Sequence, residues 1–236
     1  MGVRIPVKLN DSKLVSVSFE LRFESSEAYS DLIALNLANS LVKLGIGPIF
    51  QLPVMQLPPI ARANDPALRY SPLLGVKQEN LVVQVGPRVL VVTTEDYPGW
   101  AAFSSAIQKF LDCTKDYRIR TERIGFRTIN FFADMDIENS LKTKVETAVE
   151  LEKSSCNFSI VYNQDDCRAR ISFSNDAKMS RNNQQGQKGS FLDIDSFFEG
   201  NPDEMIEKIN SLHSLGKKVF FESLTDDFVQ SMRPEY

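Results

Sequence analysis

The chain has 236 residues, of which 42% are hydrophobic and 25% are charged, and this composition is typical of a globular protein. It excludes a chain that is mostly disordered, collagen-like or fibrous. Lys and Arg total 27 against 31 Asp and Glu, which gives a formal net charge of −4. A general nucleic-acid binder needs a surplus of cations, so we expect no such activity.

Hydropathy limits where the chain is expected to reside. No stretch approaches the ~20 consecutive apolar residues that cross a bilayer. The first residues lack the apolar run of a secretory signal. We therefore expect a cytoplasmic protein with no membrane partner.

The chain has too few cysteine and histidine residues for a disulfide framework, most zinc sites or a Ser-His-Asp triad. Cys113, Cys156 and Cys167 are odd in number and show no C-x-x-C spacing, which argues against a disulfide framework and a structural zinc site. His213 is the single histidine, which excludes most zinc sites and a Ser-His-Asp triad. Neither of the common glycine-rich phosphate-binding fingerprints occurs. We expect no cofactor.

The N-terminal half begins with a predicted strand and helix. Residues 15–23 alternate apolar and polar side chains, which predicts a strand with one buried face. Helical spacing of apolar residues follows over about 26–44, and Gly45 closes the helix. Six prolines within residues 48–80 predict a long irregular connection, with an edge strand near 50–57.

A hairpin, a helix and a strand complete this half. Residues 81–94 predict a tight hairpin around Gly86-Pro87-Arg88, and a helix is expected to start at Asp96 and Pro98. Residues 118–133 return to a strand pattern. The order β-α-loop-β-β-α-β is that of a split β-α-β unit. We therefore predict a ferredoxin-like α+β lobe over residues 1–134, with residues 48–80 as its Pro-rich loop.

The second half has a different pattern. Residues 137–152 fit helical and strand spacing equally, so both assignments stay open. A hairpin is expected over 157–173, a polar mobile loop over 174–190 and a strand over 191–198. These elements predict a small antiparallel sheet in a second lobe, residues 135–236.

A long C-terminal helix is expected to cover this sheet. Asn201, Pro202 and Glu204 have the spacing of a capped helix start. An apolar stripe then continues for about 28 residues and includes the predicted core residues Phe220, Leu224 and Phe228, with His213 at its edge. We assign these four residues structural roles.

Two acidic residues form a candidate metal site. Asp193 and Asp195 lie two positions apart in a predicted strand, so both carboxylates project from one face. Hard oxygen ligands at this spacing suit Mg²⁺ or Mn²⁺. The alternative is a solvated sheet face opposite Leu192 and Ile194.

Arginines on the strand at 118–133 form a candidate anion site. Arg123 and Arg127 share one face of that strand and could clamp a phosphate or carboxylate, with Trp100 presenting its indole N–H at the same cleft. The alternatives are a core tryptophan and cross-strand ion pairs from the arginines to Glu20 and Glu24.

Several motifs follow one another in a recognisable order: Glu20-Leu21-Arg22-Phe23, Tyr97-Pro98-Gly99-Trp100, Arg123 to Asn130, and Leu212-His213 with Phe220 and Thr225-Asp226. In these motifs the chain resembles a sporadically distributed family of uncharacterised prokaryotic proteins of about this length. Thr128 departs from the pattern, which usually has an aromatic residue there. The resemblance implies kinship and no particular activity, and the patchy distribution points to a defence-associated role.

Two functions of different classes follow. The missing catalytic and cofactor motifs favour a non-enzymatic interaction or regulatory protein, accessory or antitoxin-like. Its partner would be a protein, the product of a neighbouring gene, or a second copy of the chain. The alternative is a small anionic-ligand-binding domain or a metal-dependent enzyme that uses Arg123 and Arg127 with Asp193 and Asp195.

Overall fold

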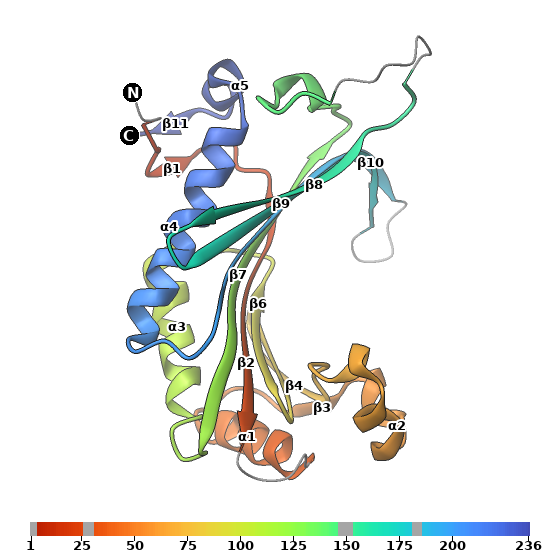
Figure 1. Ribbon diagram of the computed structural model, residues 1–236, viewed down its shortest axis with the longest axis vertical. Coiled ribbons are helices and arrows are strands. Elements are labelled where there is room, and N and C mark those ends of the chain that lie inside the picture. The colour runs from red at the N-terminus through yellow and green to blue at the C-terminus, as the bar shows by residue number, and fades with distance from the viewer. Residues whose placement is uncertain (1–3, 26–30, 146–152, 181–185) are drawn as a thin grey trace. The chain divides into compact units, whose positions relative to one another are not determined.

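The structure, a computed structural model, describes residues 4–25, 31–145, 153–180 and 186–236. Within these residues the protein is an α+β fold in which nine strands form one antiparallel sheet, in the order β3-β4-β5-β6-β2-β7-β10-β9-β8 (Figure 1). The sheet consists of β2 (Leu14–Ser25), β3 (Ile49–Gln51), β4 (Leu74–Gln78), β5 (Leu81–Gly86), β6 (Val89–Thr94), β7 (Ile119–Ala133), β8 (Asn157–Gln164), β9 (Cys167–Met179) and β10 (Gln187–Glu199). A second sheet pairs β1 (Lys8–Leu9) with β11 (Pro234–Glu235).

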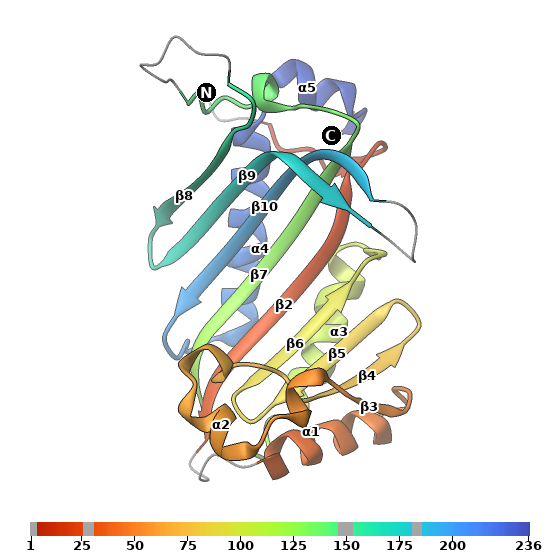
Figure 2. The ribbon, with the colours of Figure 1, turned by 90° about the vertical axis from the view of Figure 1, so that its right-hand side faces the viewer.

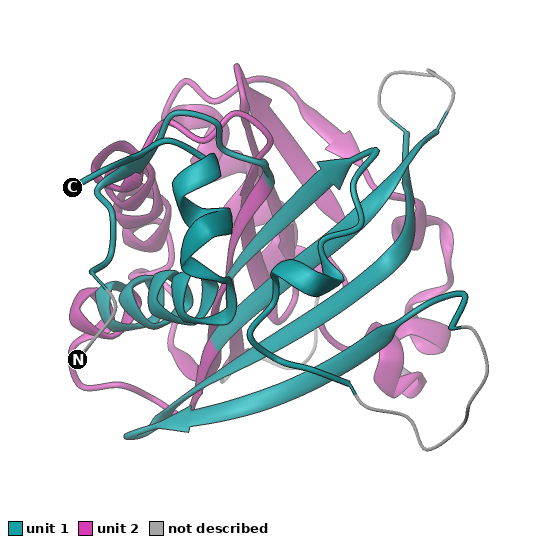
Figure 3. Cartoon of the chain, turned by 90° about the horizontal axis from the view of Figure 1, so that it is seen from above, with its two compact units in different colours: residues 1–15, 127–196, 210–236 teal, residues 16–126, 197–209 magenta. Residues whose placement is uncertain are grey.

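Contacts between residues divide the chain into two compact units (Figure 3). Unit 1 contains residues 1–15, 127–196 and 210–236, and unit 2 contains residues 16–126 and 197–209. Each unit combines segments that are far apart in the sequence. The boundaries fall inside β2, β7, β10 and the helix α4 (Met205–Ser223).

The strands of unit 2 follow the predicted hydrophobic pattern. The alternate residues Val17, Phe19, Leu21 and Phe23 of β2 are all buried, which confirms this strand. The predicted hairpin is also confirmed, because β5 pairs with β6 from Leu81↔Thr94 to Gly86↔Val89 and leaves a two-residue turn. β6 in turn pairs antiparallel with β2.

The helices of unit 2 are close to their predicted positions. The predicted helix over 26–44 corresponds to α1 (Asp31–Lys43), and residues 26–30 lie outside the described residues. Gly45 ends α1 with a φ of 80°, a conformation that favours glycine. The helix expected at Asp96 is α3 (Trp100–Asp112), which begins four residues later. Its first bond runs from the N–H of Phe103 to the carbonyl of Gly99, at 3.0 Å.

Residues 48–80 are more ordered than predicted. β3 confirms an edge strand near the expected position, but the segment also contains α2 (Pro59–Asn64) and the missed strand β4. The prolines do not prevent helix here, because Pro59 occupies the first helical position, where no N–H is needed. Arg62 is 1% exposed and ties α2 to α1, donating to both oxygens of Asp31 at 2.9 and 2.7 Å.

The predicted separate sheet of residues 135–236 is not found in the described part of the chain. Instead β10, β9 and β8 continue the nine-stranded order beyond β7. The loop predicted over 174–190 is also wrong for most of its length, because β9 extends to Met179 and β10 begins at Gln187. Its polar residues belong in strands because they have partners: buried Ser190 donates to the Met135 carbonyl at 2.8 Å.

The C-terminal helical region confirms a long helix but not an unbroken one. α4 (Met205–Ser223) passes behind β9 and β10 in Figure 2, and α5 (Asp226–Ser231) follows after a break. The break occurs because Leu224 forms a bridge with Leu141. Asn201 does not cap α4, since its side chain accepts from the Thr121 N–H at 3.2 Å. A Cβ on Gly216 would lie 2.9 Å from Ser196 Oγ, so glycine allows α4 to approach β10.

The two assignments left open for residues 137–152 both fail in the described portion. Glu138–Ser140 form one 3-10 turn, and Leu141 forms an isolated bridge to Leu224. Residues 146–152 lie outside the described residues.

In the described ranges no helix is long and apolar enough to cross a membrane.

Candidate functional site

β8 lies at one end of the nine-stranded sheet, where β9 is its single neighbour among the described residues. The two strands pair in continuous register from Asn157↔Ser174 to Gln164↔Cys167. Gln164 and Cys167 close a two-residue loop, and the two residues that close such a loop are hydrogen-bonded to each other. From this pair towards Asn157, hydrogen-bonded and non-hydrogen-bonded pairs alternate along the two strands. The backbone N–H and C=O groups of Asn157, Ser159, Val161 and Asn163 therefore point away from β9. Within the described residues no backbone group accepts or donates a hydrogen bond at this outer edge.

The edge of β8 lacks the features that usually protect an edge strand. Its sequence, Asn-Phe-Ser-Ile-Val-Tyr-Asn-Gln, contains no charged residue and no proline. It is eight residues long, and the side chains of Val161 and Tyr162 are 45% and 41% exposed. Natural edge strands are commonly short, charged, bulged or interrupted by proline. The opposite edge strand, β3, has only three residues and is followed by Pro53.

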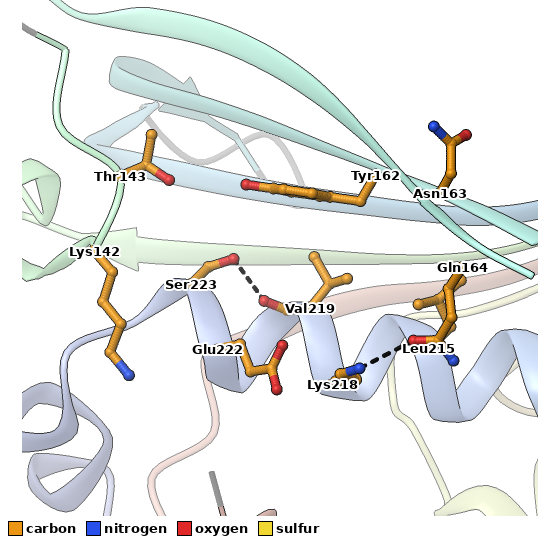
Figure 4. Close-up of a pocket in the computed structure, with 10 residues that line it drawn as sticks. All are labelled: Lys142, Thr143, Tyr162, Asn163, Gln164, Leu215, Lys218, Val219, Glu222 and Ser223. Carbon is orange, nitrogen blue, oxygen red and sulfur yellow. Dashed lines mark hydrogen bonds between the residues drawn. The ribbon is translucent and has the colours of Figure 1, made fainter. Parts of the chain in front are cut away.

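A pocket of about 420 Å³ lies between the β8 edge and α4, entirely within unit 1 (Figure 4). Tyr162 and Gln164 of β8 form one side, and Leu215 and Val219 of α4 form an apolar floor. Figure 4 shows the Tyr162 ring extending along β8 above α4, with the Gln164 side chain turned towards α4. Residues of β9 and β10 do not line this pocket, so it opens at the edge of the sheet and not beneath its centre.

Charged side chains stand around this apolar floor. Lys142 and Lys218 bring two positive charges and Glu222 brings one negative charge. Lys218 Nζ donates to the Gln164 side-chain oxygen at 3.0 Å, which is a neutral partner. Glu222 follows one helical turn further along α4 and lines the same pocket. Lys142 Nζ lies 3.0 Å from Asp226, whose side chain is 82% exposed, so this ion pair is well screened by solvent.

The predicted metal and anion residues include one direct ion pair. Arg127 Nε and Nη2 donate to the two carboxylate oxygens of Asp193, at 2.8 and 2.7 Å. A guanidinium therefore stands where a cation would coordinate Asp193, and the carboxylate stands where an anion would bind Arg127. Asp195 is half-buried. No group of three or more His, Cys, Asp or Glu side chains is placed to hold a metal in the described chain.

Arg123 belongs to a different set of contacts. Its Nη1 donates to Glu20 at 2.5 Å, and its guanidinium lies 4.8 Å from the centre of the Phe197 ring. Arg120, on the same strand, donates to Glu24 at 2.8 Å. The alternative of cross-strand ion pairs to Glu20 and Glu24 therefore holds for Arg123 but not for Arg127, which pairs with Asp193. Trp100 is half-buried at the start of α3 and packs edge-on against Phe126, with 5.4 Å between ring centres.

The single histidine and the cysteines are poorly suited to nucleophilic chemistry. Burial and the nearby Lys217 lower the pKa of His213 to about 4, so the imidazole is neutral at pH 7. Burial raises the pKa of Cys113 and of Cys156, which keeps both thiols protonated.

The three predicted core residues of the C-terminal region differ in burial. Leu224 is fully buried and Phe220 is 8% exposed. Phe228 is half-buried and lies on α5, where its ring centre is 5.6 Å from that of Phe132.

Comparison of the chain with protein-family models and with curated proteins gives no match.

Sequence reasoning missed the β8 edge and its pocket. The sequence pattern identifies β8 as a strand, but nothing local distinguishes an edge strand from a central one. The lack of charge in residues 157–164 would instead favour a central strand, because exposed edge strands commonly carry charged residues. The sequence does not indicate that Lys142 and Lys218 line the same pocket, because they are 76 positions apart and come to it only in the folded chain.

Proposed function

We propose that this protein is a non-enzymatic interaction protein that binds an extended segment of a partner protein along β8. The observation that supports this proposal is the outer edge of β8, which is eight residues long, contains no charged residue and has no paired strand in the described part of the chain. Strand addition to such an edge is a common mode of peptide recognition, in which main-chain hydrogen bonds provide affinity. The backbone N–H and C=O groups of the four outward-facing residues of β8 provide the donors and acceptors that an added strand needs.

The chemistry of the described side chains agrees with a binding role. Arg127 and Asp193 neutralise each other, and Arg123 is engaged by Glu20. The anionic-ligand and metal-enzyme alternative therefore has no specific observation in its favour.

The kind of partner is a separate proposal, motivated by the family resemblance. We propose that the partner is a protein encoded by a neighbouring gene and that the pair acts in a prokaryotic regulatory or defence system.

We also propose a ferredoxin-like arrangement for β2-α1-β5-β6-α3-β7, supported by the neighbouring strand order β5-β6-β2-β7.

A proline substitution tests the binding mode directly. Val161→Pro removes an N–H that points away from β9, so the β8–β9 ladder keeps its bonds while the outer edge loses one donor. Val161→Ala is the matched control, because it removes the exposed side chain and keeps the N–H. A phage-displayed library of random peptides is selected on the wild-type protein, and the selected peptides are measured against all three proteins.

We expect the selected peptides to bind the wild type and Val161→Ala, and to lose about tenfold or more in affinity for Val161→Pro. Amide hydrogen exchange should show new protection at Ser159, Val161 and Asn163 when peptide is bound. Equal binding to the alanine and proline variants, or protection elsewhere in the chain, would contradict strand addition.

A further inference from the structure

The pocket beside β8 lies where side chains of an added strand would arrive. It is lined by the edge strand, by α4 and by Lys142-Thr143, but not by β9 or β10. In a strand, alternate side chains point to the same face of the sheet. Every second side chain of a segment paired with β8 would therefore point towards α4, and those opposite Tyr162 and Gln164 would reach this pocket.

The floor of the pocket suits an aliphatic side chain. Leu215 and Val219 are 5% and 8% exposed, and the half-exposed Tyr162 ring adds an apolar wall. A volume of about 420 Å³ accommodates one large side chain together with part of its neighbour on the same face. Burial of an aliphatic group there removes apolar surface from water on both partners.

The charged residues at the pocket determine which kind of side chain is favoured beside the aliphatic one on the added strand. Lys142 and Lys218 carry positive charge at the pocket and Glu222 carries negative charge, while Asp226 outside the lining is paired with Lys142. Lys218 is the stronger candidate contact, because its partner Gln164 is neutral whereas Lys142 is already beside Asp226. A carboxylate on the added strand would give Lys218 an opposite charge at the rim.

We infer that the pocket selects extended segments with a large aliphatic side chain and, two residues away on the same face, an acidic side chain. This inference rests on the proposed strand addition to β8. Charge complementarity also favours a different protein over a second copy of this chain. β8 itself has no acidic residue, so pairing two β8 edges would bring no carboxylate to Lys218.

Charge reversal tests the inference. The peptides selected on the wild-type protein are sequenced, and one is synthesised with Glu, Gln or Lys at the acidic position. Affinities are measured for the wild type, for Lys218→Glu, and for Lys188→Glu as a control whose exposed lysine on β10 does not line the pocket.

We expect an aliphatic and an acidic residue two positions apart to recur among the selected peptides. The Glu peptide should bind the wild type about fivefold more tightly than the Gln peptide, and Lys218→Glu should reverse the order in favour of Lys. Lys188→Glu should leave the order unchanged.

The contrary outcomes separate this inference from the proposed function. Equal affinity of the three peptides, with β8 amides still protected on binding, would overturn the charge selection and leave strand addition standing. Absence of β8 protection would overturn both. Dimerisation of the free protein through β8, seen by sedimentation and abolished by Val161→Pro, would make a second copy the occupant and overturn the inference.

Discussion

At the scale of single residues, partners decide what a charged side chain can do. Asp193 has the spacing of a metal ligand, yet in the fold both of its oxygens accept hydrogen bonds from Arg127. A two-bond guanidinium–carboxylate contact is strong and leaves each partner little capacity for another ion. Lys218 is the opposite case, because its hydrogen-bond partner is the neutral Gln164 amide and not a carboxylate.

His213 should make stability depend on pH. Burial and Lys217 lower its pKa from 6.5 to about 4, so between these values the unfolded chain binds a proton that the folded chain does not. The free energy of unfolding should therefore fall as the pH is lowered from about 6.5 towards 4. Urea unfolding across this range measures the slope.

His213→Gln is the control for that experiment, since glutamine does not titrate. The variant should show a shallower slope than the wild type in the same window. His213 is the single histidine of the chain, so no other imidazole contributes. Identical slopes for both proteins would show that His213 is protonated equally in the folded and unfolded states.

At the scale of elements, the face that a helix buries follows from its sequence more closely than its ends do. The apolar stripe correctly predicts burial of Phe220 and Leu224. It does not indicate that the helix ends at Ser223, because the apolar spacing continues across the break. The break depends on the bridge from Leu224 to Leu141, a contact 83 positions away in the chain. The start of α4 is likewise displaced because Asn201 bonds to β7.

Phe220→Ala should destabilise the fold whatever the function. Phe220 is 8% exposed and its ring centre lies 5.1 Å from that of Phe221, so truncation leaves a cavity beneath α4. Removal of a buried phenylalanine side chain costs about 3–5 kcal/mol, which is a large part of a domain's stability. Thermal unfolding should show a much lower midpoint or insoluble protein.

Glu222→Ala, on the exposed face of the same helix, is the matched control and should change the midpoint little. If Phe220→Ala keeps the wild-type midpoint, the stripe is a docking surface and not part of the core.

At the scale of the whole molecule, a long uncharged edge has consequences for association. A free outer edge that can accept a partner strand can also pair with an edge of another molecule. We expect the native protein to remain monomeric in sedimentation at ambient temperature, and to aggregate through this edge only on heating, when the fold is partly opened. Val161→Pro should reduce this association, because it interrupts the row of outward donors, whereas Val161→Ala should not.

Light scattering during a temperature ramp, with the unfolding midpoint recorded on the same samples, measures this effect. A variant that scatters less at an unchanged midpoint supports association through β8. Equal scattering of the proline variant and the wild type would place the associating surface elsewhere.

The sequence by itself determined the elements with strong local patterns. Alternation predicted β2 and β7, a two-residue turn joined β5 to β6, and helical spacing predicted α1, α3 and α4, because each pattern depends on which face of a short segment is buried. It did not reveal β4, whose five residues include Gly75 and follow a run of prolines. It also placed a loop over the polar ends of β9 and β10.

Only the tertiary structure decided which strands are neighbours and which edge is left open. Arg127 and Asp193 are 66 positions apart, and their pairing needs β7 and β10 side by side. Hydrophobic alternation records a buried face but carries no information about the strand on either side, so a central strand and an edge strand look alike. The open edge of β8 and the pocket between it and α4 therefore exist as features of the fold alone.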